Sequence, residues 1–245
     1  MARKLNTKLL HCFGTEKGPK VTPQKAAEMI RASGITQIPI NTHNIEKVSD
    51  WRELSIGYGT ANWNTVSEYL DLSNCTPLWN INLPQSAKEA ILRTEKVVKM
   101  GGLQPIKFEV LDDTLSWSCN TEVLRAVDFL VNTDKFEVWP LIAPDQKTYF
   151  RLEEWGCPVI RLMGSPIGSQ CGILHENLNI IQSILMSKTT EIMLDGGVNS
   201  LETVLKALEL GFDSVLVNSW LFASNIDPAA LLRVICDKIH GYENE

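Results

Sequence analysis

The sequence predicts an α/β protein with a single (β/α)8 barrel, a TIM barrel, as one domain over residues 1–245. Two observations favour this fold. Eight apolar, strand-like runs alternate with amphipathic segments, and 245 residues is a usual length for eight strand–helix units. No low-complexity linker divides the chain. An open, doubly wound sheet is the competing architecture, because periodicity alone does not show whether a parallel sheet closes.

The predicted strands are short runs rich in aliphatic and aromatic residues. In chain order they cover residues 8–13, 37–42, 76–80, 106–111, 136–142, 158–163, 191–195 and 214–218. The amphipathic segments predict helices at 23–33, 86–100, 120–131, 146–155, 177–187 and 200–210. Gly34 and Gly211 follow the first and the last of these helices, where a left-handed stop belongs. A final helix is expected to begin near Asp227 and Pro228.

One predicted strand, PIKFEVL at 105–111, carries two opposite charges. Residues two apart on a strand point to the same face, so Lys107 and Glu109 share one face, and Phe108 and Val110 share the other. In a barrel, Lys107 and Glu109 would face the interior, near the end where the active site lies. A lysine enclosed there can attack a carbonyl as a neutral amine, and the carboxylate can transfer protons. A structural ion pair without chemistry is the alternative.

Three stretches after later strands indicate a phosphate site: GSPIGSQCG, LDGGVNS and LVNSW. Glycines let the backbone approach a ligand closely and expose N–H groups to anions. In these barrels, glycines after the seventh strand and polar residues after the eighth commonly form a phosphate site. Asp195, at the end of the seventh strand, is a candidate catalytic carboxylate.

Composition excludes several classes of protein. The net charge is −6, and no basic stretch predicts binding to nucleic acid or to an anionic membrane. No apolar run reaches the ~18 residues of a membrane span, and the N-terminal stretch MARKLNTKLLHCFG carries no convincing cleavage signal. The six cysteines are scattered, with no CxxC pair, which argues against a zinc site and a disulfide framework. We expect a reduced, cytoplasmic protein without a bound metal.

Several motifs then follow in a fixed order. They are Lys107-Phe108-Glu109, Val138-Trp139-Pro140-Leu141, Leu152 to Cys157, Arg161 to Gly172 with its P-I-G-S element, Leu194 to Asn199, and Ala207 to Ser219. In order and spacing they resemble the K-[LI]-E, V-L-P-Y, L-E-x-x-G-C, P-I-G-S-G-x-G, V-D-A-G and E-L-G-x-D-x-V-L-V-N motifs of the bacterial thiazole synthase family. The resemblance covers about Ile106 to Ile239, and the N-terminal third of the chain is divergent.

The resemblance implies a mechanism. Lys107 would form an imine with the ketone of 1-deoxy-D-xylulose 5-phosphate, and Glu109 and Asp195 would act as general acid and base. Dehydroglycine and the thiocarboxylate of a ubiquitin-like sulfur-carrier protein would supply the remaining atoms of thiazole phosphate. No cofactor is expected on the protein, and a homo-oligomer is expected. The residues that match the family's phosphate site are Gly164, Gly197, Asn218 and Ser219.

The first hundred residues depart from the family pattern. His43 and Asn44 stand where the family has two arginines, the stretch from Leu78 to Leu83 replaces L-P-N-T-A-G, and Gln170 replaces a glycine of the later loop. These changes keep two further hypotheses open. One is a divergent homologue, of the 2-thiosugar-synthase type, that transfers carrier-bound sulfur to another ketose phosphate. The other is a barrel that binds a phosphorylated ligand or a partner without turnover.

Overall fold

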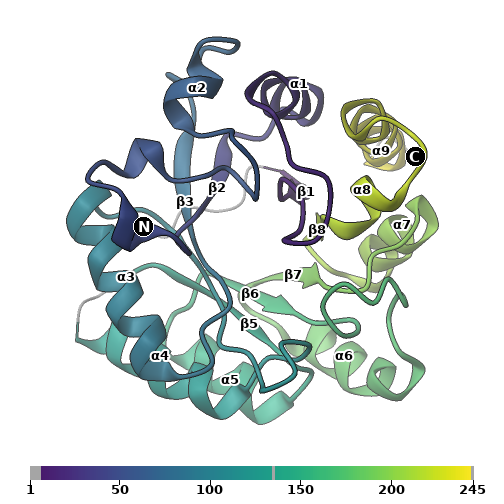
Figure 1. The fold of residues 1–245 in the computed structure, drawn as a ribbon. Coiled ribbons are helices and arrows are strands. Elements are labelled where there is room, and N and C mark those ends of the chain that lie inside the picture. The colour runs from purple at the N-terminus through teal and green to yellow at the C-terminus, as the bar shows by residue number, and fades with distance from the viewer. Residues whose placement is uncertain (1–6, 134–135, 244–245) are drawn as a thin grey trace.

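The computed structural model describes residues 7–133 and 136–243. Within them, eight parallel strands curl into a barrel with the helices outside (Figure 1), which confirms the predicted fold class. The strands are β1 (Leu9–His11), β2 (Gln37–Asn41), β3 (Thr76–Ile81), β4 (Ile106–Phe108), β5 (Val138–Ile142), β6 (Val159–Leu162), β7 (Glu191–Asp195) and β8 (Ser214–Val217). The helices are α1 (Pro23–Ser33), α2 (Trp63–Ser67), α3 (Ala87–Gly101), α4 (Asn120–Asn132), α5 (Gln146–Glu154), α6 (His175–Ser187), α7 (Leu201–Leu210), α8 (Ser219–Ala223) and α9 (Pro228–Glu243).

Helix α1 shows how local sequence sets these boundaries. The Thr22 side chain accepts a hydrogen bond from the Lys25 backbone N–H, and Pro23 occupies the first turn, where no N–H donor is needed. Gly34 ends the helix with φ 68°, in the left-handed region. Gly211 ends α7 in the same way, with φ 104°. Both predicted stops are therefore confirmed.

Strand β4 is shorter than the predicted strand at 106–111, since it ends at Phe108. Its last partner in the ladder is Pro140 of β5. Beyond Phe108 the chain leaves β5 but stays beside β3, with the Glu109 N–H donating to Ile81 O at 3.2 Å. The alternation of faces continues past the strand end, so Phe108 and Val110 are fully buried in the core.

The connection between β2 and β3 differs most from the sequence prediction of eight strand–helix units. It contains two 3-10 turns, at Ile45–Lys47 and Trp51–Glu53, and the five-residue helix α2, in place of one long helix. Three tryptophans, Trp51, Trp63 and Trp79, pack edge to face here. No long apolar stripe is needed because these large rings cover this side of the barrel.

The same connection fills the gap between β1 and β2. No ladder joins these two strands in the part of the chain that the structure describes, and they are the two ends of the strand order. Ser55 O instead accepts from the Asn41 N–H at 2.8 Å. Gly57, with φ 77°, lies so close to β1 that an added Cβ would be 2.1 Å from Phe13 O. A glycine is required there, and residues 55–59 close the barrel wall in place of a strand pair.

Two layers fill the barrel interior. Leu10, Leu78, Trp139, Val159, Met193 and Leu216 form a buried apolar cluster separate from the main core between sheet and helices. The next inward-facing position along several strands is polar or charged, because side chains alternate with a period of two. Asn80, Lys107, Arg161 and Asp195 occupy this second layer. The apolar cluster thus forms the floor on which the charged layer rests.

The buried His11 on β1 predicts a pH dependence of stability. Burial lowers its pKa from 6.5 to about 4. Its Nε2 lies 2.9 Å from Ser33 Oγ, which itself donates to Met29 O. As the pH falls below 6.5, His11 binds a proton in the unfolded chain but stays neutral in the folded protein. This difference should lower the free energy of unfolding by about 3 kcal/mol between pH 6.5 and 4. Urea unfolding across this range should show a shallower decline for His11→Gln. Equal declines would contradict the assignment.

Candidate active site

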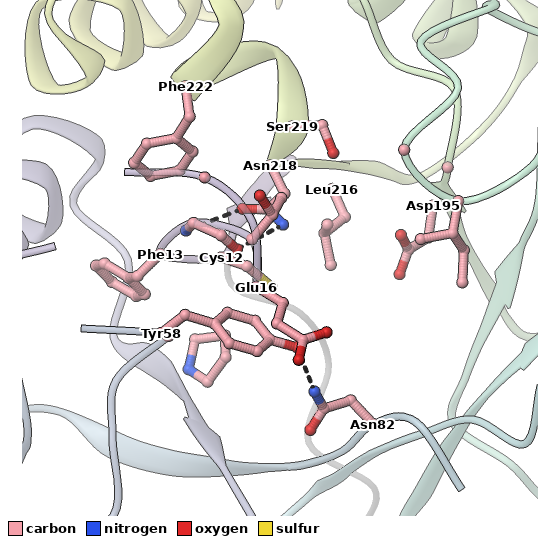
Figure 2. A pocket seen from close by; sticks show the side chains of 18 of the residues that line it. Cys12, Phe13, Glu16, Tyr58, Asn82, Asp195, Leu216, Asn218, Ser219 and Phe222 are labelled. Atoms are coloured by element: carbon pink, nitrogen blue, oxygen red, sulfur yellow. Dashed lines mark hydrogen bonds between the residues drawn. The ribbon is translucent and has the colours of Figure 1, made fainter. Parts of the chain in front are cut away.

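A cavity of about 570 Å³ opens at the carboxyl ends of the strands. Its wall takes residues from both halves of the chain, and Figure 2 shows the side that includes Tyr58, Asn82, Asp195 and Ser219. Six of the seven residues predicted for the site line it: Lys107, Glu109, Asp195, Gly197, Asn218 and Ser219. The barrel brings them together because the carboxyl ends of all its strands meet at one face.

Lys107 projects into this cavity from β4. It is 5 % exposed, and its Nζ donates to Asn80 Oδ1 at 3.2 Å. Asn80 is its ladder partner on β3, so backbone register places the amide beside the amine. The carboxylate Oδ2 of Asp195 lies 3.9 Å from the same Nζ. The lysine therefore has one neutral and one anionic neighbour inside a largely enclosed space.

Arg161 on β6 holds the carboxylates in place. Its Nε and Nη2 lie 2.8 and 2.6 Å from Asp195 Oδ2, and Nη2 lies 3.5 Å from Glu109 Oε2. Its Nη1 donates to the carbonyl oxygens of Phe108 and Trp139. The side chain is 1 % exposed. One guanidinium thus connects β4, β5, β6 and β7 through fixed, planar donors.

The site contains two buried cations, Lys107 and Arg161, and two carboxylates, Glu109 and Asp195. Because there are two positive and two negative groups, their charges offset one another in a region that holds little water. Cys12 of the cavity wall has a raised pKa, chiefly because of burial, and the charge of Lys107 partly opposes that effect. The Cys12 thiol therefore stays protonated at neutral pH.

Backbone N–H groups gather at the ends of β7 and β8. Those of Gly196, Gly197, Val198 and Ser219 have no acceptor within the described residues, and all four residues line the cavity. Gly197 has φ 92°, and an added Cβ would be 2.2 Å from Gly172 O, so only glycine fits. Unused N–H groups in a glycine turn are a common anion site.

Two predicted residues have other contacts. The Asn218 side chain forms a pair of hydrogen bonds with Gly14, at 3.1 Å from the Gly14 N–H and 3.0 Å to its carbonyl (Figure 2). It therefore joins the end of β8 to the loop after β1. Gly164 is buried behind the cavity wall, where an added Cβ would be 3.0 Å from Gly196 O. Its glycine lets the two loops after β6 and β7 pack closely.

Of the residues that depart from the family motifs, only some line the cavity. His43 and Asn44 are exposed and are not among the residues that line the cavity. Three non-glycine residues with positive φ do line it: Leu83 (75°), Leu115 (56°) and Gln170 (54°). Such backbone strain tends to collect at functional sites. The loops that present these residues differ from the family motifs in sequence.

The sequence prediction missed Arg161 and Tyr58 as site residues. The signal for Arg161 was present, because a basic residue in the middle of the apolar run PVIRLM alternates toward the interior just as Lys107 does. Tyr58 had no such signal. It comes from the irregular connection after β2, whose course the periodicity did not reveal.

Comparison with known proteins identifies the family. The family model described as thiazole biosynthesis protein ThiG matches residues 12–241. The chain belongs to this family. The thiazole synthase of Bradyrhizobium sp. strain BTAi1 is 31% identical over 221 residues, which are 88% of this chain and 79% of that protein. The thiazole synthase of Klebsiella pneumoniae is 28% identical over 91% of this chain and 81% of that protein.

Solved structures support the fold. A chain of the BexX/CysO complex of Amycolatopsis orientalis has a TM-score of 0.81 at 22% identity, with 99% of this chain and 93% of that chain covered. Phosphoribosyl anthranilate isomerase from Thermus thermophilus has a TM-score of 0.57 at 13% identity, with coverage of 96% and 100%. Both likenesses concern the barrel. The family assignment therefore rests on the sequence matches, and the fold rests on both.

The described residues contain neither a candidate membrane span nor a cluster of metal-ligating side chains. No helix among them is long and apolar enough to cross a bilayer. In residues 7–133 and 136–243, no group of three or more histidine, cysteine, aspartate or glutamate side chains is arranged to hold a metal ion.

The role of Arg161 predicts a large loss of stability on its removal. Arg161→Met should lower the free energy of unfolding by about 3–5 kcal/mol, because Glu109 and Asp195 would remain buried without their shared cation. Arg125→Met is a matched control on exposed α4, where the ion pair is with Glu122, and it should change stability by less than about 0.5 kcal/mol. Chemical denaturation of both variants is the measurement. Equal stability of the two variants would show that Arg161 does not organise the site.

Proposed function

We propose that this protein is a sulfur-incorporating enzyme in which Lys107 forms an imine with the ketone of a phosphorylated ketose. The observation that carries the proposal is the position of Lys107 Nζ, enclosed in the cavity between Asn80 Oδ1 and the Asp195 carboxylate. The neutral amine is the form that attacks a carbonyl, and the Asp195 carboxylate, 3.9 Å from Nζ, lies near enough to take up its proton. The family of the chain supports the same chemistry.

In the proposed reaction, Nζ adds to the ketone carbon and water leaves as the imine forms. Asp195 has the carboxylate oxygen that lies near Nζ, so we assign to it the proton transfers of the amine. Glu109 is held by longer contacts, to Arg161 at 3.5 Å and to the Leu83 N–H at 3.3 Å. We assign to Glu109 the proton transfers at the carbon atoms of the sugar, since its contacts are longer than those of Asp195 with Arg161.

The substrate phosphate is proposed to bind the N–H groups of Gly196, Gly197, Val198 and Ser219. A backbone site of this kind needs no side-chain cation, which agrees with the net charge of −6. Gly164 supports this site by letting the loops after β6 and β7 pack together. Asn218 holds the loop after β1 in place through its hydrogen bonds with Gly14.

Sulfur is proposed to arrive as the thiocarboxylate at the C-terminus of a small carrier protein. The sulfur atom replaces a sugar oxygen, and the carrier is released as the carboxylate, so no oxidant or reductant is needed. The chain of the BexX/CysO complex that shares this barrel was solved together with its partner. The rim here presents the partly exposed Leu115 and Ile167, which suit contact with an extended peptide.

Two substrates are candidates. The names of the relatives favour 1-deoxy-D-xylulose 5-phosphate, which with dehydroglycine would give thiazole phosphate. A different ketose phosphate is favoured by the divergent rim, in which Leu83, Leu115 and Gln170 adopt strained backbone conformations beside the cavity. Both candidates require the same imine at Lys107 and the same carrier.

Borohydride trapping tests the imine. Incubation with a phosphorylated ketose and borohydride should add one reduced substrate mass to the protein, on the peptide that contains Lys107. Lys107→Ala should lose the adduct completely and keep its fold, as read by intact mass and circular dichroism. Lys17→Ala, which removes an exposed lysine of the cavity rim, should retain it. An adduct on another lysine, or none with any ketose phosphate, would refute the proposed function and favour a binding barrel.

A further inference from the structure

Tyr58 and Asn82 form a hydrogen-bonded pair on the wall of the cavity. Asn82 Nδ2 donates to Tyr58 Oη at 2.7 Å, and both residues line the cavity (Figure 2). Tyr58 belongs to residues 55–59, which replace a β1–β2 ladder, and Asn82 follows β3 directly. The pair is rigidly supported, because Gly57 packs against Phe13 on one side and Arg93 Nη1 donates to Asn82 O at 2.6 Å on the other.

This pair has unused hydrogen-bonding capacity. Tyr58 Oη accepts a hydrogen bond from Asn82 and donates none within the described residues. Burial, followed by the charge of Glu109, raises the pKa of Tyr58 to about 12, so the hydroxyl keeps its proton. Asn82 is 5 % exposed, and its Oδ1 is buried without a partner among those residues. An unsatisfied buried acceptor costs about 1–3 kcal/mol. This cost remains in the folded state. Because Nδ2 donates to Tyr58 Oη, the hydroxyl proton of Tyr58 points away from Asn82.

The charges nearby select what this hydroxyl can bind. Glu109 and Glu16 both raise the pKa of Tyr58 by their negative charge, and both line the cavity. The ammonium of Lys20, 5.9 Å from the centroid of the Tyr58 ring, offsets only part of this negative charge, so this side does not favour an anionic group. A neutral oxygen that accepts from Tyr58 Oη is the compatible partner. A sugar hydroxyl meets this condition.

The position of the pair relative to Lys107 identifies which hydroxyl of the sugar lies near Tyr58. Asn80 contacts Lys107, and Asn82 is two residues farther along the same strand direction, about 7 Å nearer the cavity mouth. The proposed phosphate site is at the ends of β7 and β8, and Figure 2 shows Asn82 across the cavity from Ser219. A ketose held by its phosphate and by an imine at its ketone carbon therefore directs its C1 end toward Tyr58.

We infer that Tyr58 is a specificity-determining residue, positioned by Asn82, that binds the C1 hydroxyl of a ketose phosphate. This inference rests on the proposed function and names the substrate class: ketose phosphates with a hydroxymethyl group at C1 in preference to 1-deoxy sugars. A methyl group at C1 leaves the Tyr58 donor without a partner, and a site built around a polar group rejects analogues that lack its partner. The substrate is thus of the second of the two candidate kinds.

D-xylulose 5-phosphate and 1-deoxy-D-xylulose 5-phosphate test this inference, because they differ only in the C1 hydroxyl. Calorimetric titration of the wild type should give a dissociation constant about tenfold or more lower for the hydroxylated sugar. Tyr58→Phe should reduce that ratio to less than about threefold by weakening the hydroxylated sugar alone. Asn82→Ala should act in the same direction. Tyr69→Phe, at a half-exposed tyrosine outside the cavity, should keep the wild-type ratio.

The outcomes separate this inference from the proposed function. A wild type that does not discriminate, or a discrimination that Tyr58→Phe retains, overturns the inference even if borohydride traps both sugars on Lys107. Discrimination that is lost in Tyr58→Phe, without any trapped adduct, supports the inference and refutes the imine. Failure of both sugars to bind refutes both.

Discussion

The buried guanidinium of Arg161 is the interaction on which the rest of the site depends. It contacts Glu109, which follows β4, and Asp195, which ends β7, and it donates to the Phe108 and Trp139 carbonyl oxygens where the β4–β5 ladder ends. Two carboxylates and an ammonium group would be costly in this enclosed layer without it. By fixing Asp195, Arg161 also fixes the anion nearest to Lys107.

Closure of the barrel is the second constraint. The first and last strands are joined by the β1–β8 ladder and by the pair of hydrogen bonds between Asn218 and Gly14. On the other side of β1, residues 55–59 take the place of a strand partner, with Gly57 against Phe13. The segment that closes the wall also delivers Tyr58 to the cavity. The divergent N-terminal third thereby contributes a polar group to the cavity that holds the candidate lysine.

The sequence predicted what periodicity and local chemistry determine. The alternation in PIKFEVL placed Lys107 and Glu109 on the interior face, and the glycine after Asp195 marked the loop with free N–H groups. Other features depend on contacts between distant segments. Gly164, predicted as a phosphate residue, does not line the cavity, and an added Cβ there would lie 3.0 Å from Gly196 O of the next loop. The path of residues 43–62 followed from aromatic packing, which has no period, so the position of Tyr58 could not be derived.

The most direct test of this account is a crystal structure of the protein reduced with borohydride in the presence of D-xylulose 5-phosphate. The account predicts continuous density from Lys107 Nζ to C2 of the sugar, with Arg161 still bound to Asp195. It also predicts the phosphate at the N–H groups of Gly197 and Ser219, and the C1 hydroxyl at Tyr58 Oη. A sugar attached elsewhere, or one whose phosphate lies against Tyr58, would contradict it.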